Sequence, residues 1–129
     1  MKMNRVMHFQ VPVEDMPGAQ KFYEKVFGWQ IQAPSGMEGQ YHIARTGPSD
    51  ENGRPSVPGS INGGLALGRE EWRAWLVIGV DSIDEHVKKI KAAGGKLLTE
   101  KRPVLGMGFY AEGGDTEGNV LGLWQVLKG

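Results

Sequence analysis

The chain contains no cysteine among its 129 residues. This absence excludes disulfide bonds, a thiolate nucleophile, and zinc or iron–sulfur centres held by cysteine. Any metal would have to be held by histidine, carboxylate or amide groups, and the chain has only three histidines.

Net charge and long apolar runs are also missing. Lys and Arg total 15, and Asp and Glu total 15. Without an excess of positive charge no field would hold a polyanion, so we expect no nucleic-acid partner. No stretch approaches the roughly 20 apolar residues that cross a bilayer, and residues 1–5 lack the apolar run of a signal peptide. We therefore expect a cytoplasmic protein without a membrane partner.

A β-α-β-β-β order occurs in each half of the sequence. With 40% hydrophobic residues, the chain is expected to form a single domain over residues 1–129. Alternating apolar residues predict strands, and apolar residues at helical spacing predict helices. A segment rich in Gly, Pro, Ser and Asn, residues 47–60, predicts a flexible loop. The expected strands are residues 6–13, 29–32, 41–46, 61–67, 75–80, 96–99, 108–113 and 120–126, and the expected helices are residues 15–28 and 82–93.

The two halves match when the chain is compared with itself at an offset of 67 residues. Phe9 then aligns with Leu76, Met16 with Ile83, and Gly28 with Gly95. The match predicts a duplication, with one module at about residues 1–68 and another at about residues 69–129.

Several segments together resemble the vicinal oxygen chelate superfamily, which contains glyoxalase-like proteins, bleomycin resistance proteins and extradiol dioxygenases. These segments are HFQVPVED at residues 8–15, FY at 22–23, FGW at 27–29, VDSID at 80–84, GG at 94–95 and DTEGNV at 115–120. The resemblance implies an α+β fold of two tandem βαβββ modules. Their mixed sheet would curve around a cavity, with the helices outside.

Enzymes of that superfamily hold a divalent metal with side chains from four cavity strands. At the positions that the resemblance assigns to ligands, this chain has His8, Trp75 and Gly122, and strand 61–67 offers no carboxylate. One imidazole binds most divalent metals weakly, so we expect no metal cofactor. The alternative is one divalent ion in a rearranged site made by His8, His42 and Glu112.

The same placement suggests residues that bind a ligand. His8 and Gln10 would point into the cavity, Trp75 and Trp124 would form aromatic walls, and Tyr110 would add a polar group. We expect these five residues to bind a small apolar or aromatic molecule without a metal, although the two indoles could also simply fill the cavity. No catalytic residue is assigned, and a metal-dependent lyase, isomerase or dioxygenase is the alternative function.

Self-association is a further expectation. Members of the superfamily commonly pair modules across a dimer, and apolar residues such as Trp72 fall near the edges of the predicted sheet. The sequence therefore predicts a homodimer.

Overall fold

The computed structural model describes residues 2–68 and 72–127. Contacts divide the chain into two compact units. The first unit is residues 8–74, and the second unit is residues 75–129 with the N-terminal residues 1–7. The module boundary expected at residues 68 and 69 adjoins residues 69–71, which lie outside the described part, and it stays a prediction.

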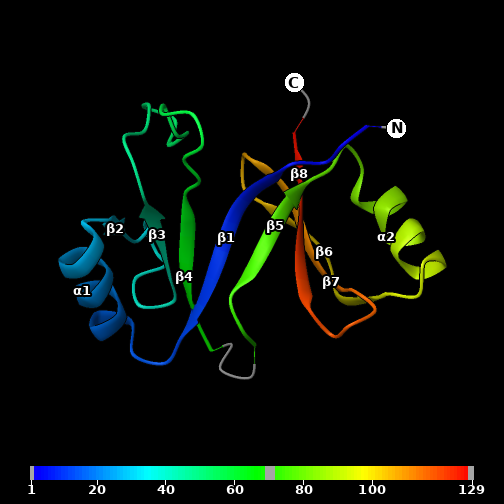
Figure 1. Ribbon diagram of the computed structural model, residues 1–129, viewed down its shortest axis with the longest axis horizontal. Coiled ribbons are helices and arrows are strands. Elements are labelled where there is room, and N and C mark those ends of the chain that lie inside the picture. The colour runs from blue at the N-terminus through cyan, green and yellow to red at the C-terminus, as the bar shows by residue number, and fades with distance from the viewer. Residues whose placement is uncertain (1, 69–71, 128–129) are drawn as a thin grey trace. The chain divides into compact units, whose positions relative to one another are not determined.

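The first unit has a four-stranded sheet with one helix on it (Figure 1). Strand order is β2-β3-β4-β1, with β4 parallel to β1 and antiparallel to β3. The elements are β1 (Val6–Val13), α1 (Met16–Phe27), β2 (Gln30–Gln32), β3 (Tyr41–Arg45) and β4 (Gly63–Leu67).

Capping fixes both ends of α1 where the sequence predicted them. The Gly18 amide donates to the Asp15 carboxylate at 3.1 Å, which satisfies one amide of the first turn. Gly28 ends the helix at φ 72°, a left-handed conformation that glycine adopts without steric cost. The helix packs against β2 and β4 around the buried residues Val13, Met16, Ile31, Ala44 and Leu65.

Strand alternation gives the sheet of the first unit two different faces. Val11 and Val13 pack toward the core with α1. His8 and Gln10 alternate with them and lie on the face away from the helix, as expected. We call this surface the open face of the unit.

The second unit repeats this arrangement with strand order β5-β8-β7-β6. Strand β8 is parallel to β5 and antiparallel to β7, and α2 packs against β6, β7 and β8. Its core contains Val80, Ile83, Ala111 and Leu123. The elements are β5 (Trp75–Gly79), α2 (Ile83–Ala92), β6 (Lys96–Val104), β7 (Gly108–Gly114) and β8 (Val120–Val126).

Residues near the N-terminus join the second unit. The Gly79 amide donates to the Arg5 carbonyl at 2.9 Å, and Lys2 pairs with Asp81 at 2.8 Å. The first residues of β1 therefore extend the second unit, while the rest of the strand belongs to the first.

Strand β6 is longer than the sequence predicted. The expected strand ended at Thr99, but pairing with β7 continues to Val104 across two irregularities in register. Pro103 lies within this extension of the strand. Proline is tolerated here because β6 is at the end of the strand order, where one side of its backbone needs no partner in the sheet.

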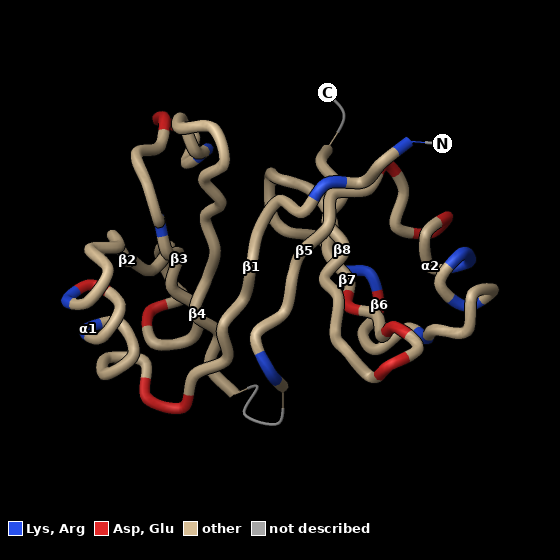
Figure 2. The backbone as a smooth tube through the Cα atoms, viewed as in Figure 1, with Lys and Arg blue, Asp and Glu red and all other residues tan. Residues whose placement is uncertain are grey.

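The structure confirms the α+β fold of two βαβββ modules. Figure 2 shows where charge lies: β1, β2, β4, β5 and β8 carry no Lys, Arg, Asp or Glu. Charged residues are instead on the helices, on β3, β6 and β7, and in the loops. Among the described residues, no helix is long and apolar enough to span a membrane.

Candidate functional site

Strand register identifies equivalent positions in the two units. In the first unit, Gly64 of β4 pairs with Gln10 of β1 on one side and with Ile43 of β3 on the other. In the second unit, Gly122 of β8 pairs in the same way with Val77 of β5 and Glu112 of β7. Two residues before these partners stand His8 and Tyr41 in one unit, and Trp75 and Tyr110 in the other. His8 is thus equivalent to Trp75, Tyr41 to Tyr110, and Gly64 to Gly122.

On the open face of the first unit, Tyr41 joins the two residues that the sequence singled out. Its hydroxyl lies 2.9 Å from Nε2 of His8 and also bonds the Gln10 amide. Oε1 of Gln10, a side chain 9% exposed, has no partner among the described residues. An unsatisfied buried acceptor costs about 1–3 kcal/mol, so this oxygen is a candidate contact for a ligand donor.

Burial keeps these groups uncharged near neutral pH. It lowers the pKa of His8 to about 4, because the imidazolium would lose its hydration. Burial also raises the pKa of Tyr41 to about 12, and the bond from Gln10 only partly offsets this. This part of the open face therefore offers neutral hydrogen-bonding groups.

In the second unit the equivalent tyrosine is the centre of a longer hydrogen-bond chain. Nε1 of Trp75 donates to Oη of Tyr110 at 3.0 Å, and that hydroxyl donates to Glu112 at 3.0 Å. Thr99 donates to the other carboxylate oxygen at 3.0 Å, and Arg102 lies 3.9 Å from the same oxygen. The carboxylate of Glu112, a residue that is 1% exposed, is thus held by neutral donors and one cation.

Tyr110 also contacts the remaining predicted site residue. It is the register partner of Trp124 across β7 and β8, and the Arg102 guanidinium lies 5.1 Å from the centre of its ring. Burial is the largest cause that raises the pKa of Tyr110, and the neighbouring Glu112 charge acts in the same direction. Trp75, Tyr110 and Trp124 therefore come together in the second unit, whereas His8 and Gln10 come together in the first.

Both glycines make room for a tyrosine hydroxyl. A Cβ atom on Gly122 would lie 2.7 Å from Oη of Tyr110 and 2.9 Å from Cγ2 of Val77. At Gly64 the nearest atom to such a Cβ is the hydroxyl oxygen of Tyr41. Each tyrosine thus fills the space above a glycine of the neighbouring strand.

Residues 5–123 match the Glyoxalase/Bleomycin resistance protein/Dioxygenase superfamily. The chain belongs to this superfamily. It is 33% identical over 110 residues to a probable lactoylglutathione lyase of Vibrio parahaemolyticus, covering 82% of this chain and 78% of the relative. A probable lactoylglutathione lyase of Vibrio cholerae is 32% identical over 109 residues, with the same coverage.

Several solved structures share the fold at low sequence identity. A hypothetical protein from Bacillus halodurans superposes with a TM-score of 0.68 at 15% identity, covering 99% of this chain and 98% of that one. Methylmalonyl-CoA epimerase from Mycobacterium tuberculosis gives 0.62 at 16% identity, over 95% and 88%. The Mn(II)-bound glyoxalase from Novosphingobium aromaticivorans gives 0.63 at 18% identity, over 98% and 42%.

The positions expected to hold the superfamily's metal do not offer a matching donor set. Trp75 has only an N–H donor, and Gly122 has no side chain. Gly64, the position in strand 61–67 that the register makes equivalent to Gly122, has none either. Nε2 of His8 is engaged by Tyr41 at 2.9 Å. A carboxylate at either glycine would collide with the tyrosine that lies over it. The residues present do not fit the metal centre.

The rearranged metal site is not assembled either. His42 lies on the helix side of its sheet, where Nδ1 is 2.7 Å from Oε1 of Gln20 and Nε2 accepts from the Gly39 amide at 2.9 Å. His8 lies on the opposite face of the same sheet. Within residues 2–68 and 72–127, no group of three or more His, Asp or Glu is placed to hold a metal ion.

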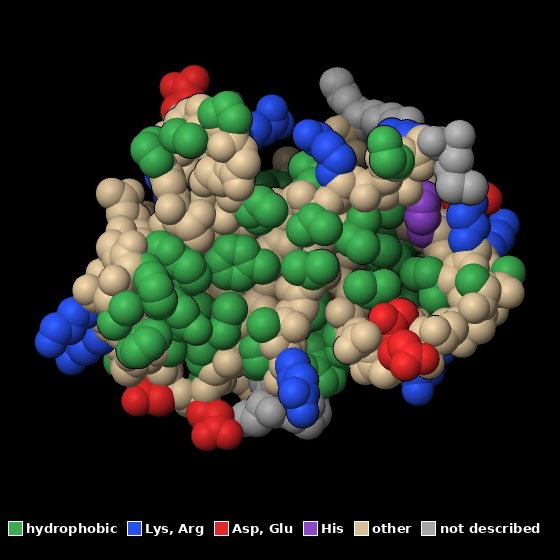
Figure 3. All heavy atoms as spheres, in the orientation of Figure 1, with side chains coloured by type: hydrophobic (Ala, Val, Ile, Leu, Met, Phe, Trp, Pro, Cys, Tyr) green, Lys and Arg blue, Asp and Glu red, His purple; other side chains and the backbone are tan. Residues whose placement is uncertain are grey.

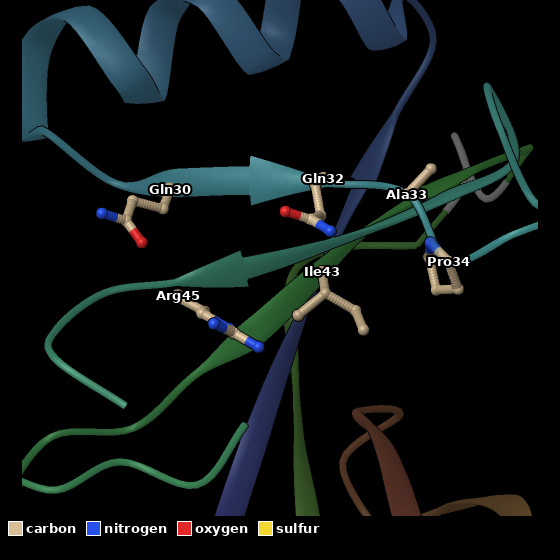
Figure 4. Close-up of a pocket in the computed structure, with 6 residues that line it drawn as sticks. All are labelled: Gln30, Gln32, Ala33, Pro34, Ile43 and Arg45. Carbon is tan, nitrogen blue, oxygen red and sulfur yellow. The ribbon is translucent and has the colours of Figure 1, made fainter. Parts of the chain in front are cut away.

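A separate small pocket lies on the first unit (Figure 4). It measures about 100 Å³ and is lined by Gln30, Gln32, Ala33, Pro34, Ile43 and Arg45. Drug-sized ligands occupy pockets of roughly 300–1,000 Å³, so this one suits a single chemical group or a very small molecule.

Sequence reasoning missed Tyr41, and it missed Thr99 and Arg102 as partners of Glu112. The signal for Tyr41 is its equivalence to Tyr110, but these residues are 69 apart and not 67. A comparison that allowed loops of different length would have aligned them.

Proposed function

We propose that this protein binds a small, uncharged aromatic or apolar molecule on the open faces of its modules without a metal ion. One observation supports this above all: the hydroxyls of Tyr41 and Tyr110 occupy the space above Gly64 and Gly122, where coordinating side chains would have to stand. In both modules a neutral phenol takes the place of a metal ligand.

The chemistry of the two faces supports a neutral ligand. His8 and Tyr41 are uncharged near pH 7, and Oε1 of Gln10 is a buried acceptor with no partner in the described chain. In the second unit the Glu112 charge is held by Tyr110 and Thr99 and lies near Arg102. A neutral ring with one N–H or O–H donor would match these groups, with stacking on indole adding affinity.

Phenol and indole are suitable probes, and the backbone amides of Gly64 and Gly122 are suitable reporters. We expect either probe to shift one or both amide signals in a ¹H–¹⁵N correlation spectrum. Saturable shifts that are lost in Gln10→Leu or Trp75→Leu support binding on that face. Absence of shifts at both glycines for both probes contradicts the proposal.

Metal content tests the other half of the proposal. Protein purified without a histidine tag and dialysed should hold far less than one divalent ion per chain by elemental analysis. Added Mn²⁺, Ni²⁺ or Zn²⁺ should neither raise the thermal midpoint nor produce turnover. A stoichiometric ion that is retained would overturn the proposal that the protein works without a metal.

A lactoylglutathione lyase is the second candidate, because two relatives above 30% identity carry that name. It requires a metal site that the residues at positions 8, 64, 75 and 122 do not supply. Lyase activity measured with each of the same three metals decides between the two functions.

Self-association also stays a prediction. Trp72 is half-buried, so only part of its side chain is available for contact with a second chain. Apolar side chains gather over α1 (Figure 3), where Phe22, Val26 and Phe27 are each more than half exposed. Light scattering should give twice the 14.1 kDa mass of one chain, and a mass of one chain would contradict the homodimer.

A further inference from the structure

The pocket between β2 and β3 differs chemically from the rest of the open face. Three of its side chains are hydrogen-bond donors, namely the amides of Gln30 and Gln32 and the guanidinium of Arg45, and none of its six lining residues is acidic. Ile43 and Pro34 form an apolar wall beside them. A pocket that offers one cation and two amide donors, with no carboxylate, is suited to binding an oxyanion.

Strand geometry explains how these donors converge. Gln30 and Gln32 are two residues apart on β2, so both point to the same face. Gln30 is the register partner of Arg45, and Gln32 is the partner of Ile43. Figure 4 shows both glutamine side chains directed toward β3, and the guanidinium extending toward Ile43.

Arg45 has no carboxylate partner within 4 Å in the described chain. A Cβ atom on Gly53 would lie 3.6 Å from Nη2 of Arg45, which places the guanidinium beside the loop of residues 47–60. The group is therefore positioned against protein but not neutralised by an acid there.

In the second unit, the position equivalent to Ile43 carries a carboxylate. Thr99 pairs with Glu112 there, as Gln32 pairs with Ile43 in the first unit. Glu112 is bonded by Thr99 and Tyr110 and approached by Arg102. Ile43 thus stands where the second unit has its buried carboxylate. The cation near it in the first unit, Arg45, comes from β3, whereas Arg102 comes from β6, so the first unit has a cation of its own and polar donors without that acid.

From this difference between the modules we infer that the β2–β3 pocket binds the carboxylate of a small molecule. Arg45 supplies a charged, fork-shaped donor, Gln30 and Gln32 supply amide N–H groups, and Ile43 packs against a short apolar tail. The volume of about 100 Å³ limits the occupant to a carboxylate with a few carbons, either free or as the end of a larger ligand. The inference goes beyond the proposed function and does not depend on the absence of a metal.

Propionate is the probe, observed through the side-chain amide signals of Gln30 and Gln32 and the Nε signal of Arg45. We expect saturable shifts with sodium propionate, and not with propionamide or with sodium chloride at the same ionic strength. Equal shifts with chloride or propionamide, or none with propionate at 50 mM, overturn the inference.

Two substitutions locate the site. Arg45→Gln should weaken propionate binding about tenfold or more, whereas Lys21→Gln, which removes an exposed charge from α1, should leave it unchanged. Undiminished binding in Arg45→Gln overturns the inference. A comparable loss in Lys21→Gln also overturns it, because it would show a general charge effect.

Ile43→Glu provides the sharpest comparison because it installs the acid of the second unit at the equivalent position. Ile43 is 37% exposed, so a carboxylate is tolerated there, and it should occupy the donors and abolish the propionate shifts. Ile43→Gln is the neutral control and should still bind. Propionate binding to Ile43→Glu at wild-type strength overturns the inference.

Discussion

Removing the Tyr110 hydroxyl tests how the second unit holds its buried carboxylate. Tyr110→Phe keeps the ring but deletes the acceptor for Trp75 and the donor to Glu112, each at 3.0 Å. A hydrogen bond to a charged group contributes about 1.5–3 kcal/mol and a neutral one about 1 kcal/mol. The expected loss in unfolding free energy is therefore about 2.5–4 kcal/mol.

The first unit offers a matched control at the equivalent position. Tyr41→Phe also deletes one hydroxyl, but its partners, His8 and Gln10, are neutral. Its expected cost is about 1–2 kcal/mol, because no charged group loses a donor. The difference between the two variants measures the added contribution of the Glu112 charge.

Urea unfolding at pH 7, followed by far-UV circular dichroism, gives both values. Should the units unfold separately, amide exchange at Leu65 and Leu123 reports on each core by itself. A cost for Tyr110→Phe that is equal to or below that of Tyr41→Phe would refute the reasoning. Thr99 and Arg102 would then hold the carboxylate without help from the tyrosine.

Three further outcomes are expected. The pKa of His8 lies at about 4 in the fold against 6.5 for the free side chain, so the unfolded chain takes up the proton first and stability falls as the pH drops from about 6.5 toward 4. Protonation of His8 should lower the unfolding free energy by about 2 kcal/mol between pH 7 and pH 5. In urea titrations the His8→Gln variant should lack this decrease. Equal dependence of the unfolding free energy on pH in both proteins would exclude the role of His8. Asn62→Ala should lower the unfolding free energy by about 2–3 kcal/mol and speed proteolysis of residues 47–60. The reason is that Asn62, a residue 6% exposed, makes three side-chain hydrogen bonds to residues 46–53. An unchanged cleavage rate would contradict that role. Gly122→Ala should destabilise by about 1–3 kcal/mol through contact with the Tyr110 hydroxyl, and by less in Tyr110→Phe; additive costs in a double-mutant cycle would count against that contact.

The sequence predicted the order of elements because each has a local signature. Asp15 and Gly28 mark the ends of α1, and Met16 and Ile83, aligned at the offset of 67, are the first residues of the two helices. The end of β6 could not be predicted locally, since its last residues are held as a strand by pairing with β7. Flexibility of the loop of residues 47–60 stays a prediction, and the loop carries a bridge between Ser49 and Pro55 and bonds to Asn62 that the sequence did not predict.

The site was predicted only in part, for a related reason. Alternation within β1 was enough to assign His8 and Gln10 to the face away from the helix. Which side chain lies over Gly64 depends on the register of β3, and no pattern within one strand specifies it. The sequence therefore did not identify Tyr41 as a residue of the site.

The same pairing of a tyrosine hydroxyl with a glycine occurs at equivalent positions in both modules. Each tyrosine reaches over the neighbouring strand only because a glycine stands there, and each glycine lacks a side chain that would coordinate. The two features are coupled by sterics, so a carboxylate at position 64 or 122 would require the tyrosine to shift or to be replaced. This coupling gives a physical reason why each module has a tyrosine hydroxyl over a glycine at the equivalent position.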